Sequence, residues 1–208
     1  QRRMLPVTAV HTGPGKGKSN AAFGMALRGW NQGWSIGVFQ FVKSAKWRVG
    51  EENALTALGR LHEQTGEGGP VEWHKMGAGW SWSRKQGSEE DHAQAALEGW
   101  REIRRRIEAE THQLYVLDEF TYVLKWGWVD VSEVVEVLQN RPGYQHVVIT
   151  GRDPHPDLLA IADSPRFVPN ARLAKRIVSS SAHEQEAFLR GVPVSVRAWL
   201  LDAAERDG

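Results

Sequence analysis

Short apolar runs alternate with longer segments of helical pattern along the chain. Runs typical of buried strands occupy residues 5–10, 35–42, 71–75, 113–117 and 146–150. Segments with helical character lie between them, at residues 20–32, 50–59, 88–110 and 131–140. Strands that alternate with helices favour a mostly parallel sheet with helices on both faces. We therefore predict an α/β fold that binds its ligands at the carboxyl ends of the strands.

Length, charge and composition narrow the classes of partner. A chain of 208 residues is consistent with one domain that buries a substantial core. A net charge of +1 with 25% charged residues gives no basic footprint for duplex nucleic acid or an anionic membrane, while small anions remain candidate ligands. The absence of cysteine excludes disulfides and thiolate metal ligands. Because no secretory or membrane-spanning run is present, we expect a cytoplasmic protein.

A glycine-rich turn joins the first predicted strand to the first predicted helix. It reads Thr-Gly-Pro-Gly-Lys-Gly-Lys-Ser over residues 12–19, and this strand-loop-helix context is typical of a phosphate loop. Glycines let backbone N–H groups converge on phosphate oxygens, and the helix N-terminus adds partial positive charge. In the usual spacing of a phosphate loop, a glycine stands where this chain has Thr12. An ordinary glycine-rich turn between strand and helix is therefore the alternative. The candidate phosphate ligands are Thr12, Gly13, Gly15, Lys16, Gly17, Lys18, Ser19 and Asn20.

Other basic residues are weaker candidates for the same ligand. Lys16 is either a second phosphate contact or a solvated lysine. Arg152 follows the strand at 146–150 and could offer a planar donor fork to a polyphosphate, although structural pairing with an acid explains it nearly as well. Arg28, on the helix after the loop, is a candidate of the same kind.

Two acidic residues end the apolar run at 113–117. Asp118 and Glu119 occupy the position of the acidic strand end that accompanies a phosphate loop in nucleotide-binding folds. Magnesium prefers oxygen ligands and usually keeps several waters, so Ser19, one or two carboxylates and the phosphates would suffice to hold it. The alternative is a pair of acids that cap the following helix.

Taken in order, these motifs resemble one family, the P-loop ATP:corrinoid adenosyltransferases of bacterial cobalamin synthesis. The resemblance covers roughly residues 7–163 and rests on the phosphate loop together with a series of further matches. These are Ala-Ala-Phe-Gly at 21–24, Val-Phe-Gln-Phe-Val-Lys at 38–43, Gly-Glu-Glu at 50–52, Gly-Trp-Ser-Trp at 79–82, Leu-Asp-Glu-Phe-Thr-Tyr at 117–122 and Val-Ile-Thr-Gly-Arg at 148–152.

The resemblance implies a P-loop NTPase (RecA-like) fold and a specific reaction. Cobalt(I) of a corrinoid attacks the 5′ carbon of ATP, and triphosphate leaves. Lys18, the backbone of Gly15 and Gly17, and Mg²⁺ or Mn²⁺ on Ser19 would then stabilise the charge of the departing triphosphate. The resemblance also implies a homodimer and an electron-donating reductase, such as a flavoprotein. Neither nucleic acid nor a membrane is an expected partner.

The same resemblance gives a role to two of the ten tryptophans. Trp80 would displace the lower axial ligand of cobalt(II), with Trp82 packed beside it. Removing an axial donor lowers the energy of the orbital that accepts the electron, so a biological reductant can reach cobalt(I). Without the resemblance, two aromatic residues that pack a loop onto the core would be the preferred interpretation.

The carboxyl-terminal part of the chain departs from the family pattern. We expect an adenosyltransferase domain at 1–163 and, at 164–208, an atypical tail of the same domain that cannot be aligned. This tail is either specific to a lineage or the product of a shifted reading frame. None of the eight histidines shows metal-ligand spacing, so we assign them no catalytic role.

Two other functions fit the phosphate loop. A P-loop phosphotransferase or ATPase would cleave the γ-phosphate and could use Glu119 to orient the nucleophile. A noncatalytic relative would bind ATP or a corrinoid without turnover.

Overall fold

The computed structural model describes residues 5–41, 50–76 and 89–167, with backbone alone at 164–167. Within these ranges, six parallel strands form one sheet in the order β3-β2-β4-β5-β1-β6. The strands are β1 (Thr8–Thr12), β2 (Ile36–Gln40), β3 (Val71–Lys75), β4 (Leu114–Asp118), β5 (His146–Thr150) and β6 (Ser164–Phe167). The predicted parallel α/β fold is confirmed.

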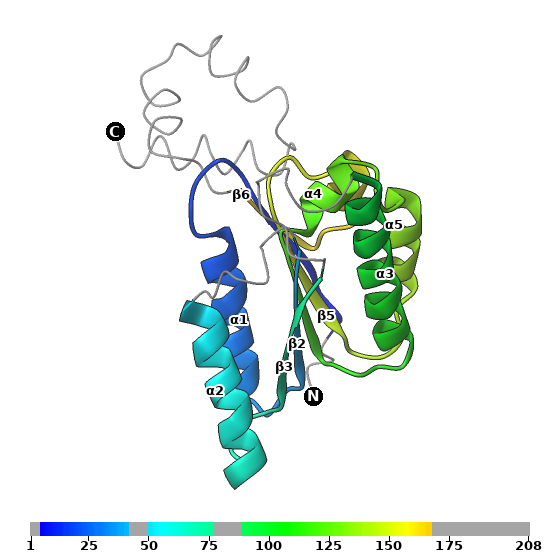
Figure 1. Cartoon of the computed structure of the whole chain (residues 1–208). Coiled ribbons are helices and arrows are strands. Elements are labelled where there is room, and N and C mark those ends of the chain that lie inside the picture. The colour runs from blue at the N-terminus through cyan, green and yellow to red at the C-terminus, as the bar shows by residue number, and fades with distance from the viewer. Residues whose placement is uncertain (1–4, 42–49, 77–88, 168–208) are drawn as a thin grey trace, which may run out of the picture.

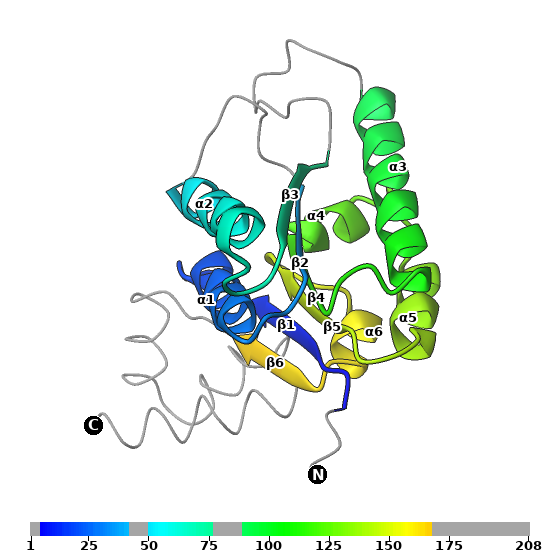
Figure 2. The same cartoon turned by 90° about the horizontal axis from the view of Figure 1, so that it is seen from below.

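Helices cover both faces of this sheet (Figures 1 and 2). One face carries α1 (Lys18–Asn31) and α2 (Gly50–Thr65). The other carries α3 (Glu89–Glu108), α4 (Phe120–Lys125), α5 (Val131–Asn140) and α6 (Pro156–Ala160). Because parallel strands need crossover connections, the helices between successive strands return the chain to the same end of the sheet. No helix among the described residues is long and apolar enough to cross a membrane.

Alternation along the central strands supplies a core on each face. On β4, Leu114 and Val116 belong to the core under α1 and α2, whereas Tyr115 and Leu117 belong to the core under α3 and α5. Side chains of successive strand residues point to opposite faces, so a strand buried on both sides has an apolar residue at every position. This explains the continuous apolar pattern of the run at 113–117.

Most predicted elements lie within a few residues of their observed bounds. For β3, α5 and β5 the predicted and observed bounds are the same. The prediction for α2 was too short because it ended at Gly59. This glycine is buried inside the helix, where an added Cβ would lie 2.9 Å from the carbonyl oxygen of Val71 on β3. Gly59 therefore serves close helix-to-strand packing and does not end the helix.

Three short elements were missed by the sequence prediction, namely α4, α6 and β6. The two helices have six and five residues, too few to show a helical period. Strand β6 begins at Ser164 and pairs in parallel with β1, from Ala9↔Ser164 to Thr12↔Phe167. Backbone pairing therefore continues past residue 163, the expected end of the family resemblance.

Candidate active site

The phosphate loop connects the end of β1 to the first turn of α1. Gly17 occupies the N-cap position of α1 with φ of 103°, a left-handed conformation that glycine adopts without steric cost. The N-cap makes no side-chain hydrogen bond, and the first turn contains no acidic residue. The N-terminus of α1 is therefore neither capped by a side chain nor neutralised by an acid in its first turn, an arrangement suited to an anion.

The Lys18 side chain lies within this loop. It is only 8% exposed, and its Nζ donates hydrogen bonds to the carbonyl oxygens of Gly13 at 2.9 Å and Gly15 at 2.5 Å. Burial lowers the pKa of Lys18, whereas the nearby charge of Glu119 acts in the opposite direction. The loop thus holds an ammonium group at the place where a bound phosphate would need one.

Asp118 joins four elements beneath the loop. Its carboxylate is fully buried, and its Oδ1 accepts hydrogen bonds from Ser19 Oγ at 2.6 Å and Thr150 Oγ1 at 2.9 Å. Its Oδ2 accepts a third from Gln40 Nε2 at 3.0 Å. The donors come from α1, β5 and β2, so one carboxylate fixes the first turn of α1 against three neighbouring strand ends. Sequence analysis did not assign Gln40 or the Thr150 hydroxyl to the site.

Glu119 differs from its neighbour in backbone and surroundings. It has φ of 61°, and its N–H donates to Thr150 Oγ1 at 3.0 Å. It occupies the N-cap position of α4, but its side chain makes no capping hydrogen bond. The side chain instead lines the cavity in front of the loop. Helix capping therefore does not explain Glu119. Of the two acids, Asp118 is a buried acceptor that joins neighbouring elements, and Glu119 lines the cavity.

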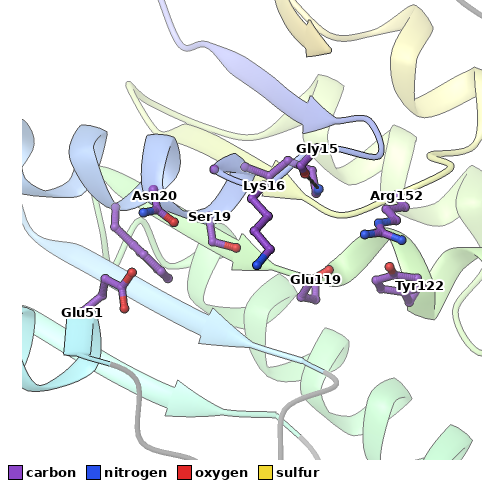
Figure 3. A pocket seen from close by; sticks show the side chains of 11 residues that line it. Gly15, Lys16, Ser19, Asn20, Glu51, Glu119, Tyr122 and Arg152 are labelled. Atoms are coloured by element: carbon purple, nitrogen blue, oxygen red, sulfur yellow. Dashed lines mark hydrogen bonds between the residues drawn. The ribbon is translucent and has the colours of Figure 1, made fainter. Parts of the chain in front are cut away.

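A cavity of about 420 Å³ opens in front of the phosphate loop. Figure 3 shows Asn20 and Glu51 toward one end of it and Arg152 and Tyr122 toward the other, with Ser19 between them. The lining residues are Gly15, Lys16, Gly17, Lys18, Ser19, Asn20, Phe23, Glu51, Glu119, Tyr122 and Arg152. The cavity therefore combines the loop with side chains from α2, α4 and the segment after β5.

Arg152 reaches the loop from the segment after β5. Its Nη2 donates to the carbonyl oxygen of Pro14 at 3.4 Å. Two contacts hold the same segment to α4, a hydrogen bond from Thr121 Oγ1 to the Arg152 carbonyl at 2.8 Å and an ion pair between Lys125 and Asp153 at 2.6 Å. The guanidinium is thereby held at the cavity edge by backbone anchoring, and no acid within the described ranges pairs with it.

The remaining predicted residues fall into three groups. Thr12 ends β1 at the base of the loop, next to Gly13. Arg28 lies exposed in the last turn of α1, about 15 Å along the helix from Lys18, and does not line the cavity. Trp80 and Trp82 lie outside the described residues.

Three cavity residues were not predicted as site residues, namely Phe23, Glu51 and Tyr122. Each belongs to a segment that sequence analysis had quoted for the family resemblance, at 21–24, 50–52 and 117–122. That membership was the available signal. No local pattern showed that their side chains would meet in front of the loop, because this depends on the packing of α1, α2 and α4.

Comparisons with known proteins agree with this geometry. Residues 5–182 match the family described as ATP:corrinoid adenosyltransferase BtuR/CobO/CobP, so the match runs beyond the expected limit at residue 163. The chain is 38% identical over 158 residues to the corrinoid adenosyltransferase of Escherichia coli K12, covering 76% of this chain and 74% of that protein. It is equally similar to corrinoid adenosyltransferase CobA of Salmonella typhimurium, with the same coverage. The corrinoid adenosyltransferase of Pseudomonas aeruginosa is 37% identical over 158 residues, covering 76% and 72%. This chain belongs to the ATP:corrinoid adenosyltransferase family.

Proposed function

We propose that this chain transfers the 5′-deoxyadenosyl group of ATP to the cobalt(I) of a corrinoid in cobalamin biosynthesis or salvage. In this reaction a cobalt–carbon bond forms at the 5′ carbon while the bond from that carbon to the triphosphate oxygen breaks. The triphosphate leaves with the electron pair. No general base is needed, because the metal nucleophile carries its own electron pair.

The observation that carries this proposal is the phosphate loop with its buried lysine in a chain of this family. The Lys18 ammonium, the N-terminus of α1 and Arg152 supply positive charge around a cavity of about 420 Å³. Charge on the leaving triphosphate increases as the carbon–oxygen bond breaks. Donors placed beforehand at the loop stabilise that charge without reorganisation during the reaction.

The donor set near the loop fits a magnesium ion. The Ser19 hydroxyl and the buried Asp118 carboxylate lie 2.6 Å apart, and Glu119 lines the adjoining cavity. Among the described residues, no group of three or more His, Asp or Glu could enclose a metal ion, so phosphate and water oxygens would complete the coordination. When bound, the ion would neutralise phosphate charge, and Ser19 with Asp118 or Glu119 would hold it there.

We also infer three features that rest on family resemblance and composition. The chain would act as a homodimer, receive electrons from a reductase such as a flavoprotein, and work in the cytoplasm. The lack of cysteine supports a reducing compartment. Size-exclusion chromatography with light scattering tests the dimer, and a mass corresponding to one chain would contradict it.

One experiment separates this function from its alternatives. The protein is incubated anaerobically with ATP, Mg²⁺ and chemically reduced cob(I)alamin, and the corrinoid spectrum and phosphate products are followed. Adenosylcobalamin together with triphosphate is the expected outcome. Orthophosphate without a cobalt–carbon bond would identify a phosphotransferase or ATPase, and ATP binding without any product would identify a noncatalytic relative.

A further inference from the structure

Gln40 is a fully buried amide at the carboxyl end of β2. Two residues before it on the same face of the strand, Val38 belongs to the core under α1 and α2. Burying an amide costs free energy unless it makes hydrogen bonds, so its place at the end of an apolar strand calls for a reason. Gln40 does not line the cavity, and any part that it has in ligand binding must pass through a neighbour.

That neighbour is Asp118, which stands opposite Gln40 in the parallel pairing of β2 with β4. The Gln40 Nε2 donates to Asp118 Oδ2 at 3.0 Å. The backbone around both residues is fixed, because the Phe41 N–H donates to the Asp118 carbonyl oxygen at 2.9 Å and the Met76 N–H to the Gln40 carbonyl oxygen at 2.8 Å. The amide thus reaches the carboxylate from a strand end that is hydrogen-bonded on both sides.

The two oxygens of Asp118 have different donors. Oδ1 accepts from the hydroxyls of Ser19 at 2.6 Å and Thr150 at 2.9 Å, whereas Oδ2 accepts from Gln40. Donors at both oxygens fix the rotation of the carboxylate plane and keep Oδ1 turned toward Ser19. A hydroxyl has one proton and two lone pairs. Because the Ser19 proton is given to Asp118, the lone pairs of Ser19 Oγ remain available to a cation.

We propose that Gln40 is a positioning residue for the cation that is bound together with ATP. Its amide holds the Asp118 carboxylate in the orientation that accepts the Ser19 proton, and Ser19 thereby presents its lone pairs to the ion. Hydrogen-bond partners behind the direct ligands of a metal typically change its affinity by about 10- to 100-fold. This inference rests on the proposed function in taking ATP and Mg²⁺ as ligands, and it does not involve the corrinoid.

Gln145 is a matched control before the amino end of β5, whereas the site lies at the carboxyl ends of the strands. It is 2% exposed, and its Nε2 donates to the carbonyl oxygens of Ile107 at 2.9 Å and Pro142 at 2.8 Å. In both glutamines, Oε1 is buried and has no hydrogen-bond partner among the described residues. Replacing either one by the unbranched methionine removes a buried amide, but only Gln40 contacts Asp118.

The test measures ATP binding by calorimetry without corrinoid, once with saturating Mg²⁺ and once with EDTA. The proteins are wild type, Gln40→Met and Gln145→Met, and urea unfolding shows that each is folded. We expect Mg²⁺ to increase the ATP affinity of wild type and Gln145→Met by the same factor. In Gln40→Met this factor should fall by about tenfold or more, while ATP affinity in EDTA stays at the wild-type value.

The contrary outcomes separate Gln40 from the cation itself. If Gln40→Met keeps the full effect of Mg²⁺, or binds ATP equally weakly with and without the ion, Gln40 serves only the fold or the loop and the proposal is wrong. Equal ATP affinity of wild type in Mg²⁺ and EDTA would overturn both the proposed cation and the role of Gln40. Should Gln40→Met not fold, Gln40→Asn, whose amide is one methylene shorter, gives the same comparison. Failure of adenosylation in wild type with the expected binding pattern would count against the proposed reaction alone.

Discussion

Ser19 Oγ donates a hydrogen bond of 2.6 Å to Oδ1 of Asp118, a residue 99 positions further along the chain. The contact joins the first turn of α1 to the end of β4, and β5 lies between β4 and β1 in the sheet. Both groups are candidate oxygen ligands of one ion. The phosphate loop and the acidic strand end therefore form one unit before any ligand is considered.

Replacement of Asp118 should disturb both the fold and the site. Asp118→Ala would leave the Ser19, Thr150 and Gln40 donors without their shared acceptor in a buried place, which costs about 1–3 kcal/mol for each unsatisfied group. We expect a clear loss of stability in urea unfolding and a loss of adenosylation of at least about a hundredfold. Thr150→Ser, which retains the hydroxyl, is the control. Normal stability of Asp118→Ala would contradict the role of this carboxylate as a structural tie.

Lys18 and Lys16 are five and three residues after Gly13, and both line the cavity, but only Lys18 is buried. Lys18→Ala should abolish turnover because the phosphate loses its enclosed charge partner. Lys16→Ala should reduce the rate by less, because an exposed ammonium is hydrated and screened. Steady-state rates with cob(I)alamin measure both effects. Full activity in Lys18→Ala would contradict the role of the phosphate loop in binding the triphosphate. Equal losses of rate in the two variants would make Lys16 a second phosphate ligand.

The sequence alone predicted the sheet, most of the helices and the phosphate loop, because each leaves a local pattern. The glycines at 13, 15 and 17 and the Asp118–Glu119 pair can be read without a structure. Glu51 and Gln40 could not be placed in this way. Glu51 looks like any acid at a helix start, and Gln40 like a polar strand end, until packing brings one to the cavity and the other to Asp118.

Stability should fall as the solution is acidified, in part through His112. Burial lowers the pKa of His112 to about 4, since its ring packs against those of Phe39 and Tyr115, beside Arg106. The nearby Glu72 carboxylate acts in the opposite direction. In the unfolded chain histidine titrates near 6.5, so between these values the unfolded state binds more protons. The stabilising contribution is thus complete above about pH 6.5 and is lost as the pH falls toward about 4.

This pH effect can be measured by urea unfolding between pH 7.5 and 4.5. The full contribution of His112 would be about 3 kcal/mol as an upper bound, from about 1.4 kcal/mol per pKa unit. His112→Gln removes the titration and keeps hydrogen-bonding capacity toward Ser35, which contacts His112 Nδ1 at 2.9 Å. The variant should therefore lose less stability than wild type on acidification. Parallel curves for the two proteins would show that groups other than His112 cause the acid dependence.

The role of Trp80 can be tested by separating electron transfer from adenosyl transfer. Trp80 is expected to act on cobalt(II), before the nucleophile exists, so its loss should matter only when the reaction starts from that state. Trp80→Ala should react with chemically prepared cob(I)alamin at a rate close to wild type and react poorly from cob(II)alamin with a reductase. Trp82→Ala, expected to weaken the packing beside it, should show a smaller difference between the two assays. Equal losses of Trp80→Ala in both assays would mean that this indole supports the fold and has no part in displacing the axial ligand.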